Sequence, residues 1–164
     1  EAITEIEVSL EDTQDSISAL EGVLSNDRSI TLSDVLKSAQ DLARPCYTQI
    51  GGAPLPHLEN NPLLATKKSL AIGIISSSLT LLATQMSKLG FQGGLKINTQ
   101  DVGSGITVSI STDQLTPAVF EEVNHLLGEY VGQDPTVGIK AEGQSIQIIF
   151  LRDIFLAILL CPEF

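Results

Sequence analysis

The most constraining feature of this chain is a run without any charged residue, from Ser69 to Ser87. Its apolar residues recur at helical spacing on two neighbouring sides, which gives a wide apolar surface. The run therefore predicts a helix from Lys67 to about Lys88 that is buried against the rest of the protein. The residues of this surface are Leu70, Ile74, Ile75, Leu79, Leu81, Leu82 and Met86.

The partner of this helix follows it directly in the sequence. Gly93 and Gly94 break the helical pattern, and then Leu95–Thr99 and Ile106–Ile110 alternate apolar and polar residues, as half-buried strands do. A glycine-rich turn joins the two segments. The sequence thus predicts an apolar helix that lies flat on a sheet.

Two apolar segments are candidates for membrane-spanning helices. The uncharged run is long enough to cross a bilayer, but three consecutive serines at positions 76–78 dilute it. The second segment, Ile154–Cys161, is continuous apolar sequence but too short to span a bilayer. We therefore expect a core helix and no membrane partner.

Composition narrows the classes of function. Hydrophobic residues make up 43% of the chain and aromatic residues only 4%, so the core must be aliphatic. The net charge of −11 repels phosphate and no basic patch offsets it, which argues against a nucleic-acid partner. Cys46 and Cys161 lie far apart without metal-site spacing, as is typical of free thiols in a reducing compartment. We expect a cytoplasmic protein with no metal site.

Residues 1–28 carry the cleanest repeat in the chain. Apolar residues recur there at the alternating 3-4 spacing of a heptad stripe, and acidic residues fill the other faces. A stripe this narrow does not stabilise a helix on its own, and no other segment of the chain shows a matching stripe. We therefore predict a dimerisation helix of the helical-hairpin or four-helix-bundle kind. The alternative is a helix that packs on its own chain. The predicted dimer interface is Ile3, Ile6, Leu10, Thr13, Ile17, Leu20 and Leu24.

Residues 29–164 complete the predicted second domain. A helix is expected at Val35–Arg44, where Pro45 limits it, and another at Ala118–Tyr130. A hairpin is expected from Val137–Ala141 and Ser145–Leu151.

The predicted fold class is α+β. A small mixed sheet of about four or five strands is covered on one face by the three helices. In the Gly- and Pro-rich loop 51–62, Leu55 and Leu58 are expected to form a short extended stretch at the sheet edge.

The order of these pieces resembles the C-terminal half of a two-component sensor histidine kinase. In that family, the second helix of the dimerisation domain leads into a helix, an N-box helix, a GGxIxV strand and further strands of the ATPase-like domain. The similarity lies in order and spacing, and it covers most of residues 3–112 and, more faintly, 137–150. The phrases that carry it are ITLSDVLKSAQDLARP, SLAIGIISSSLTLL, GGLKINTQDVGSGITVSIST and GIKAEGQSIQIIF.

Departures from the family pattern bear on function. The two asparagines of the N-box, which bring side chains to ATP-bound magnesium in active kinases, fall on Gly73 and Ser77. Glycine offers no ligand, and a neutral serine is a poor one for Mg²⁺. The adenine-binding Asp-x-Gly-x-Gly is missing, which leaves Asp113 as a turn residue or a remnant, and Pro117–Tyr130 contains no Gly-x-Gly. The resemblance therefore implies a degenerate ATPase-like fold without catalytic, cofactor-binding or metal-binding residues.

The remaining chemistry-bearing residues form no convincing site. His57 lies in a loop and His125 on an amphipathic helix, so we interpret both as structural or solvated rather than as phosphoacceptors. Glu121 and Asn124 resemble the Glu and Asn of CheC-type phosphatases, but the spacing is equally typical of a polar helix face. The segment Gly103–Gly105 joins two strands, which favours a hairpin turn over a phosphate-binding loop.

These observations favour a non-catalytic, histidine-kinase-like signalling or scaffolding domain. We expect a homodimer that binds a response regulator or another protein partner. Two alternatives stay open. One is an ATP-independent histidine phosphotransferase of the ChpT or Spo0B type in a phosphorelay, which requires a histidine upstream of Glu1. The other is a structural subunit of a larger assembly.

Overall fold

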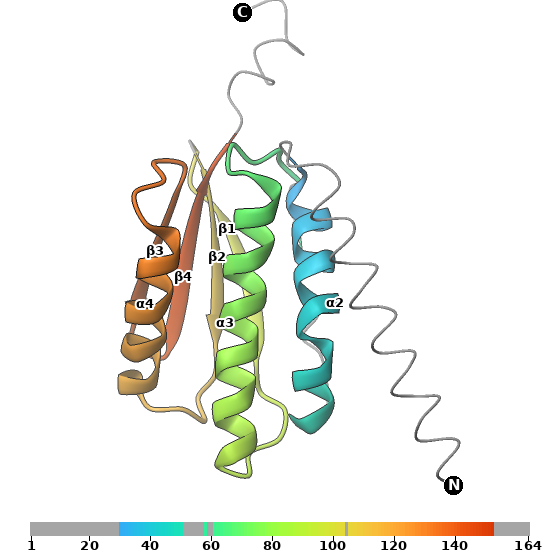
Figure 1. The fold of residues 1–164 in the computed structure, drawn as a ribbon, viewed down its shortest axis with the longest axis vertical. Helices are drawn as coiled ribbons and strands as arrows, with labels where there is room; N and C mark the ends of the chain where they lie inside the picture. The colour runs from blue at the N-terminus through green and yellow to red at the C-terminus, as the bar shows by residue number, and fades with distance from the viewer. Residues whose placement is uncertain (1–29, 51–57, 59–60, 104, 153–164) are drawn as a thin grey trace, which may run out of the picture.

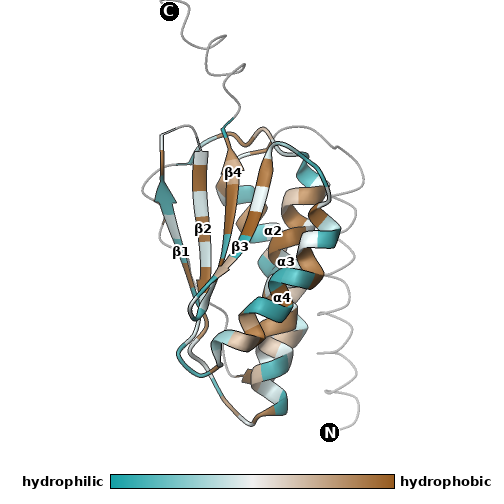
Figure 2. Cartoon of the chain, turned by 90° about the vertical axis from the view of Figure 1, so that its left-hand side faces the viewer, coloured by the Kyte–Doolittle hydropathy of each residue, from teal (hydrophilic) through white to brown (hydrophobic). Residues whose placement is uncertain are grey.

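The computed structural model describes residues 30–50, 58, 61–103 and 105–152. These residues form two layers, with three helices on one face of a four-stranded sheet (Figure 1). Viewed from the side, the sheet and the helices stand next to each other (Figure 2). The predicted α+β class and the covering of one sheet face by helices are confirmed. The elements are α2 (Leu32–Ile50), α3 (Lys68–Lys88), β1 (Lys96–Asp101), β2 (Gly105–Ser111), α4 (Pro117–Val131), β3 (Val137–Glu142) and β4 (Ser145–Leu151).

The sheet is antiparallel throughout, with the strand order β1-β2-β4-β3. This arrangement differs from the mixed sheet that the sequence predicted. Strand β4 returns from its hairpin with β3 and pairs with β2, so it lies in the interior of the sheet. Its buried residues Ile146, Ile148 and Phe150 stand opposite the buried residues of β2, which are Ile110, Val108 and Ile106.

The helix predicted from the uncharged run is α3, and it lies between α2 and α4 in Figure 1. Its side chains Ile74, Ile75, Leu79 and Leu82 are fully buried and share one core with the inward residues of the sheet. By length and composition, α3 is long and apolar enough to cross a membrane, but half of its most apolar window is buried within the fold. Gly93 and Gly94 both adopt positive φ angles as the chain turns from α3 into β1.

Helix α2 continues past the boundary that the sequence predicted. It runs through Pro45 to Ile50, whereas the sequence predicted an end at Arg44. Proline removes one helical hydrogen bond, but its cost is offset here because Ile50 is buried in the core. The Thr48 hydroxyl also donates a hydrogen bond to the Pro45 carbonyl at 2.8 Å.

The extended stretch at the sheet edge is displaced from the predicted position. Leu58 is not in a strand, and Leu55 lies outside the described residues. Instead, Leu63 forms an isolated bridge with Thr31, and Leu64 forms one with Arg152 just beyond β4. The predicted dimerisation helix of residues 1–28 and the apolar segment Ile154–Cys161 also lie outside the described residues.

Candidate functional site

The two positions that replace the N-box asparagines lie on the solvent side of α3. Gly73 and Ser77 are one helical turn apart and both are partly exposed. A Cβ atom at Gly73 would collide with the hydroxyl oxygen of Tyr130 on α4 and would lie 3.2 Å from Cζ of its ring. With Tyr130 in this place, a side chain larger than hydrogen does not fit at position 73.

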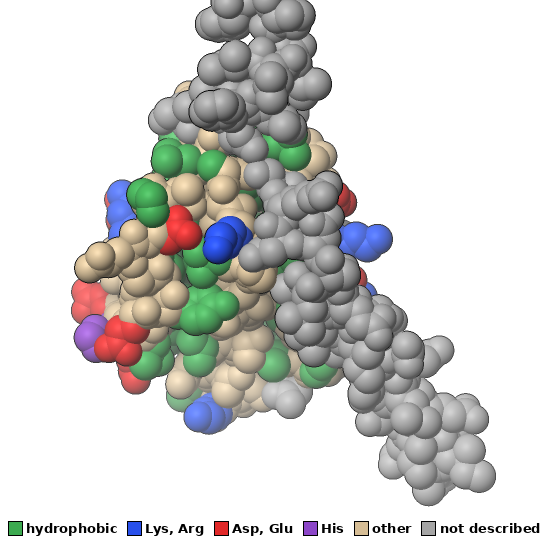
Figure 3. Space-filling view, turned by 45° about the horizontal axis from the view of Figure 1, so that its top comes forward, with side chains coloured by type: hydrophobic (Ala, Val, Ile, Leu, Met, Phe, Trp, Pro, Cys, Tyr) green, Lys and Arg blue, Asp and Glu red, His purple; other side chains and the backbone are tan. Residues whose placement is uncertain are grey.

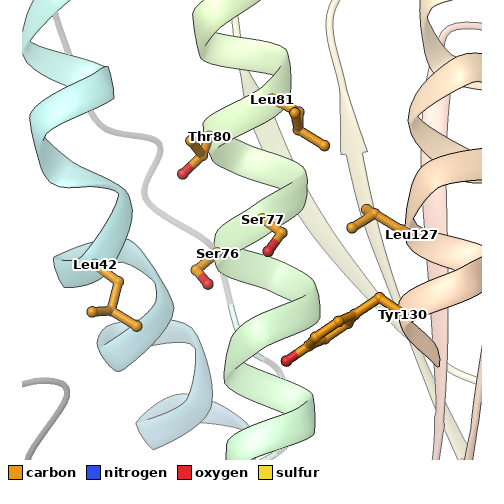
Figure 4. Close-up of a pocket in the computed structure, with 7 residues that line it drawn as sticks. All are labelled: Leu42, Ser76, Ser77, Thr80, Leu81, Leu127 and Tyr130. Carbon is orange, nitrogen blue, oxygen red and sulfur yellow. The ribbon is translucent and has the colours of Figure 1, made fainter.

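An open groove extends from this point over the outer side of the helical layer. We call it the outer groove, and its volume is about 350 Å³. Figure 4 shows Ser76 and Thr80 on the side of α3 toward Leu42 of α2, and Ser77 and Leu81 on the side toward α4. The groove is lined by Leu42, Ser76, Ser77, Thr80, Leu81, Leu127 and Tyr130.

The chemistry of the outer groove is apolar and uncharged. None of the seven lining residues is acidic or basic. Figure 3 shows hydrophobic side chains that reach the surface between uncharged atoms, with basic and acidic side chains beside them. The Ser76 hydroxyl donates to the Gly73 carbonyl of its own helix at 3.2 Å. These residues provide neither a carboxylate for Mg²⁺ nor a cation for phosphate, so the groove suits an apolar, uncharged occupant.

Asp113 lies in a different hollow from Ser77. It is exposed in the bend between β2 and α4, and it lines a hollow of about 240 Å³ with Lys96, Ser111, Thr112 and Gln144. The Gln144 amide donates to the carbonyl oxygens of Asp113 and Leu115, at 3.3 and 2.9 Å. The Gln144 side chain thus holds the backbone of the bend in which Asp113 lies.

The polar residues of α4 differ in exposure and in their contacts. The His125 side chain is 79% exposed, and its Nε2 lies 4.0 Å from Oε1 of Glu129. Glu121 is exposed, whereas the amide oxygen of Asn124 is buried without a hydrogen-bond partner. His125 is therefore a solvated residue, as expected. His57 lies outside the described residues.

The glycine segment between β1 and β2 closes a hairpin, as the sequence predicted. The Val102 amide donates to the Gly105 carbonyl at 3.1 Å, and the Gly103 amide donates to Oδ1 of Asp101 at 2.9 Å. Asp101 also forms an ion pair with Arg152 at the end of β4. Within the described part of the chain, no cluster of three or more His, Cys, Asp or Glu residues has an arrangement that would hold a metal ion.

The carboxyl group of Asp134 lies in the turn between α4 and β3. The Thr136 hydroxyl and the Thr136 amide both donate to Oδ1 of Asp134, at 2.5 and 2.9 Å. These two hydrogen bonds hold the pKa of Asp134 below its ordinary value of 3.8, and the charge of Lys67 adds to the shift. The Thr136 carbonyl in turn accepts a hydrogen bond from Thr66, directly before α3.

Sequence reasoning missed the role of two residues in the outer groove. The sequence pattern puts Tyr130 and Leu42 on the apolar sides of their helices, which predicts core positions. In the structure, Tyr130 is 54% exposed and Leu42 is only partly buried. The sequence feature that could have indicated a groove here is the pair of small residues on α3, Gly73 and Ser77.

Comparisons with known proteins identify no family for the chain. No family model matches it, and no curated protein does. Among solved structures, the histidine kinase AdeS of Acinetobacter baumannii is similar with a TM-score of 0.47 and 14% identity, over 92% of this chain and 82% of that chain. A mycobacterial sensor histidine kinase, MprB, is similar with a TM-score of 0.45 and 10% identity, over 76% of this chain and 98% of that chain.

Proposed function

We propose that this chain is a non-catalytic, histidine-kinase-like signalling or scaffolding domain. It dimerises through residues 1–28 and presents a surface to a protein partner, for which a response regulator is one candidate. The order of the sequence phrases supports this proposal, as does the arrangement of an apolar helix over a small sheet. The domain then contributes to signalling by binding rather than by phosphoryl transfer.

The observation that carries the non-catalytic part is the contact between Gly73 and Tyr130. Where a kinase of the resembled family places a magnesium-binding asparagine, this chain has a glycine whose Cβ space is filled by the Tyr130 hydroxyl. Ser77 then lies in a groove lined by leucines and hydroxyls. Carboxylates commonly bind Mg²⁺, and basic side chains commonly bind the phosphates of a triphosphate; the lining of the groove contains neither.

The dimerisation part is supported by the heptad stripe from Ile3 to Leu24. The described helices α2, α3 and α4 bury their apolar residues against the sheet and one another. None of them carries a second heptad stripe that would match it. A stripe of this kind gains stability by packing against an equivalent helix.

The absence of nucleotide binding is tested by thermal unfolding with ATP and Mg²⁺ at millimolar concentration. A ligand present at about 100 times its Kd adds about 2.7 kcal/mol to the free energy of unfolding, which raises Tm by several degrees. We expect no such rise. Mg²⁺ alone is the control, because a chain of net charge −11 attracts divalent cations without a specific site. A rise with ATP and Mg²⁺ that exceeds this control contradicts the proposal.

Dimerisation is tested by replacing both Ile6 and Leu10 with Lys in the full chain. The two charges interrupt the stripe, so the variant is expected to sediment as a monomer while the wild-type chain sediments as a dimer. The sheet domain should keep its Tm, because residues 30–152 form a core of their own. Replacing the neutral Thr4 and Ser18 with Lys is the matched control, because it adds the same two positive charges outside the stripe. A monomeric wild-type chain at about 100 μM, a concentration far above the Kd of a stable dimer, contradicts the proposal.

A further inference from the structure

The described chain ends next to the start of α3. Beyond β4, Arg152 forms a bridge with Leu64, and the Ala65 amide donates to the Leu151 carbonyl at 2.9 Å. Arg152 is also held by its ion pair with Asp101. The chain beyond Arg152 therefore continues from a point beside Leu64 and Ala65, a few residues before Lys68, where α3 begins.

The outer groove begins within a short reach of this point. At a rise of about 1.5 Å per residue, Gly73 lies about 8 Å along the helix from Lys68, and Leu81 lies about 20 Å along it. The apolar segment Ile154–Cys161 covers about 12 Å as a helix and about 26 Å when extended. It is thus long enough to cover the part of α3 from Gly73 to Leu81, which is about 12 Å long.

The composition of this segment also matches the groove. Ile154–Cys161 is uninterrupted apolar sequence, and the only charged residues between 153 and 164 are Asp153 and Glu163. The outer groove has no acidic or basic residue in its lining, and Tyr130 leaves 54% of its surface exposed there. The other candidate occupant, the stripe of residues 1–28, is flanked by acidic residues that would find no cation among the lining residues.

We propose that the segment Ile154–Cys161 packs into the outer groove of its own chain, over Tyr130 and Leu81. The apolar segment is then covered without a membrane or a second protein. Tethering favours the segment of the same chain over that of another copy, because a short link gives a millimolar effective concentration.

Hydrogen–deuterium exchange of the full chain tests this proposal with two matched variants of α4. Tyr130→Asp places a charge in the groove at a residue that is 54% exposed, and Leu126→Asp places the same charge at a residue that is 49% exposed and does not line the groove. In the wild-type chain and in Leu126→Asp, amides of residues 154–161 should exchange at least about tenfold more slowly than in an unstructured peptide. In Tyr130→Asp, this protection should be lost, while amides of β2 and β4 stay protected and report an intact fold.

Three outcomes would overturn the proposal. The first is that the segment exchanges like an unstructured peptide in the wild-type chain. The second is that it keeps its protection in Tyr130→Asp, and the third is that its protection falls when the protein is diluted. The last outcome assigns the groove to the segment of a second copy. None of these readouts depends on nucleotide or on residues 1–28, so they are independent of the proposed function.

Discussion

The two sides of α3 differ in size of side chain but not in charge. Toward the sheet, Ile74, Ile75 and Leu79 are bulky and fully buried. Toward solvent, Gly73 and Ser77 are small and partly exposed, and the helix has no charged residue on this side between Ser69 and Ser87. Exposed helix faces usually carry charged residues, because water solvates them at no cost. The inner side is therefore explained by the core, whereas the outer side needs its own explanation.

The neighbours of the two sides account for the difference. The inner side shares one core with β2 and β4, whose isoleucines and Phe150 fill the space between the layers. The outer side borders the outer groove, where small residues leave room for the exposed Tyr130 of α4. A single uncharged run in the sequence thus serves two purposes, and they are separable by mutation.

The largest expected effect comes from a charge on the inner side. Ile75→Asp places a carboxylate at a fully buried position without a partner, which costs several kcal/mol and exceeds much of the stability of a typical domain. The variant should be unfolded or insoluble, as measured by far-UV circular dichroism.

Thr84→Asp is the control for this prediction, because it places the same charge on the outer side of α3 at a residue that does not line the outer groove. Thr84 is partly exposed, so its variant should fold and change the free energy of unfolding by less than about 1 kcal/mol. A soluble Ile75→Asp protein with an unchanged spectrum would mean that the inner side does not face a core.

The sequence predicted the inner side of α3 well and the outer side poorly. Repeats of apolar residues report burial against a large partner, so Ile74, Leu79 and the alternating residues of β2 were identified from spacing alone. The same spacing places Tyr130 on the apolar side of α4, although it is half-exposed in the structure. Its exposure depends on how far α4 lies from α3, which is a tertiary property.

Local sequence patterns do not predict two further features of the fold, the strand order and the length of α2. The antiparallel strand order depends on β4 pairing with β2, a choice made by residues about 40 positions apart in sequence, which no periodicity encodes. The extension of α2 through Pro45 depends on burial of Ile50, because core packing offset the local preference of proline to end a helix.

A smaller effect is expected on the outer side, at the contact between Gly73 and Tyr130. Gly→Ala within a helix ordinarily stabilises by about 0.5–1 kcal/mol. In the wild-type chain, the new Cβ would displace the Tyr130 ring, so we expect Gly73→Ala to give less than this gain. In a Tyr130→Ala background the clash is absent, and the full gain should appear.

Urea unfolding of the four proteins in this double-mutant cycle measures the coupling between the two residues. A gain from Gly73→Ala that is the same in both backgrounds would show that the Tyr130 ring does not occupy the space beside Gly73. The observation behind the non-catalytic proposal would then be lost, while the packing of the inner side would be unaffected.

The smallest effect is expected near the N-terminal end of α3, where the Thr66 hydroxyl donates a hydrogen bond to the turn between α4 and β3. The pKa of Asp134 is lowered by hydrogen bonds from Thr136, whose carbonyl accepts a hydrogen bond from Thr66 next to α3. A lowered folded-state pKa stabilises the fold at pH values above the unfolded pKa of about 3.9, and this stabilisation is lost as the pH falls through the folded pKa. Asp134→Asn should therefore lower the free energy of unfolding slightly at neutral pH, and the difference from the wild-type chain should shrink between about pH 5 and pH 2.

Because Asp134 is close to solvent, salt should reduce the contribution from Lys67 but not that from the Thr136 hydrogen bonds. The same pair of pH titrations, read by urea unfolding at each pH, decides the matter: a difference that stays constant down to about pH 2 would mean that the Asp134 carboxylate does not accept these hydrogen bonds in the folded chain.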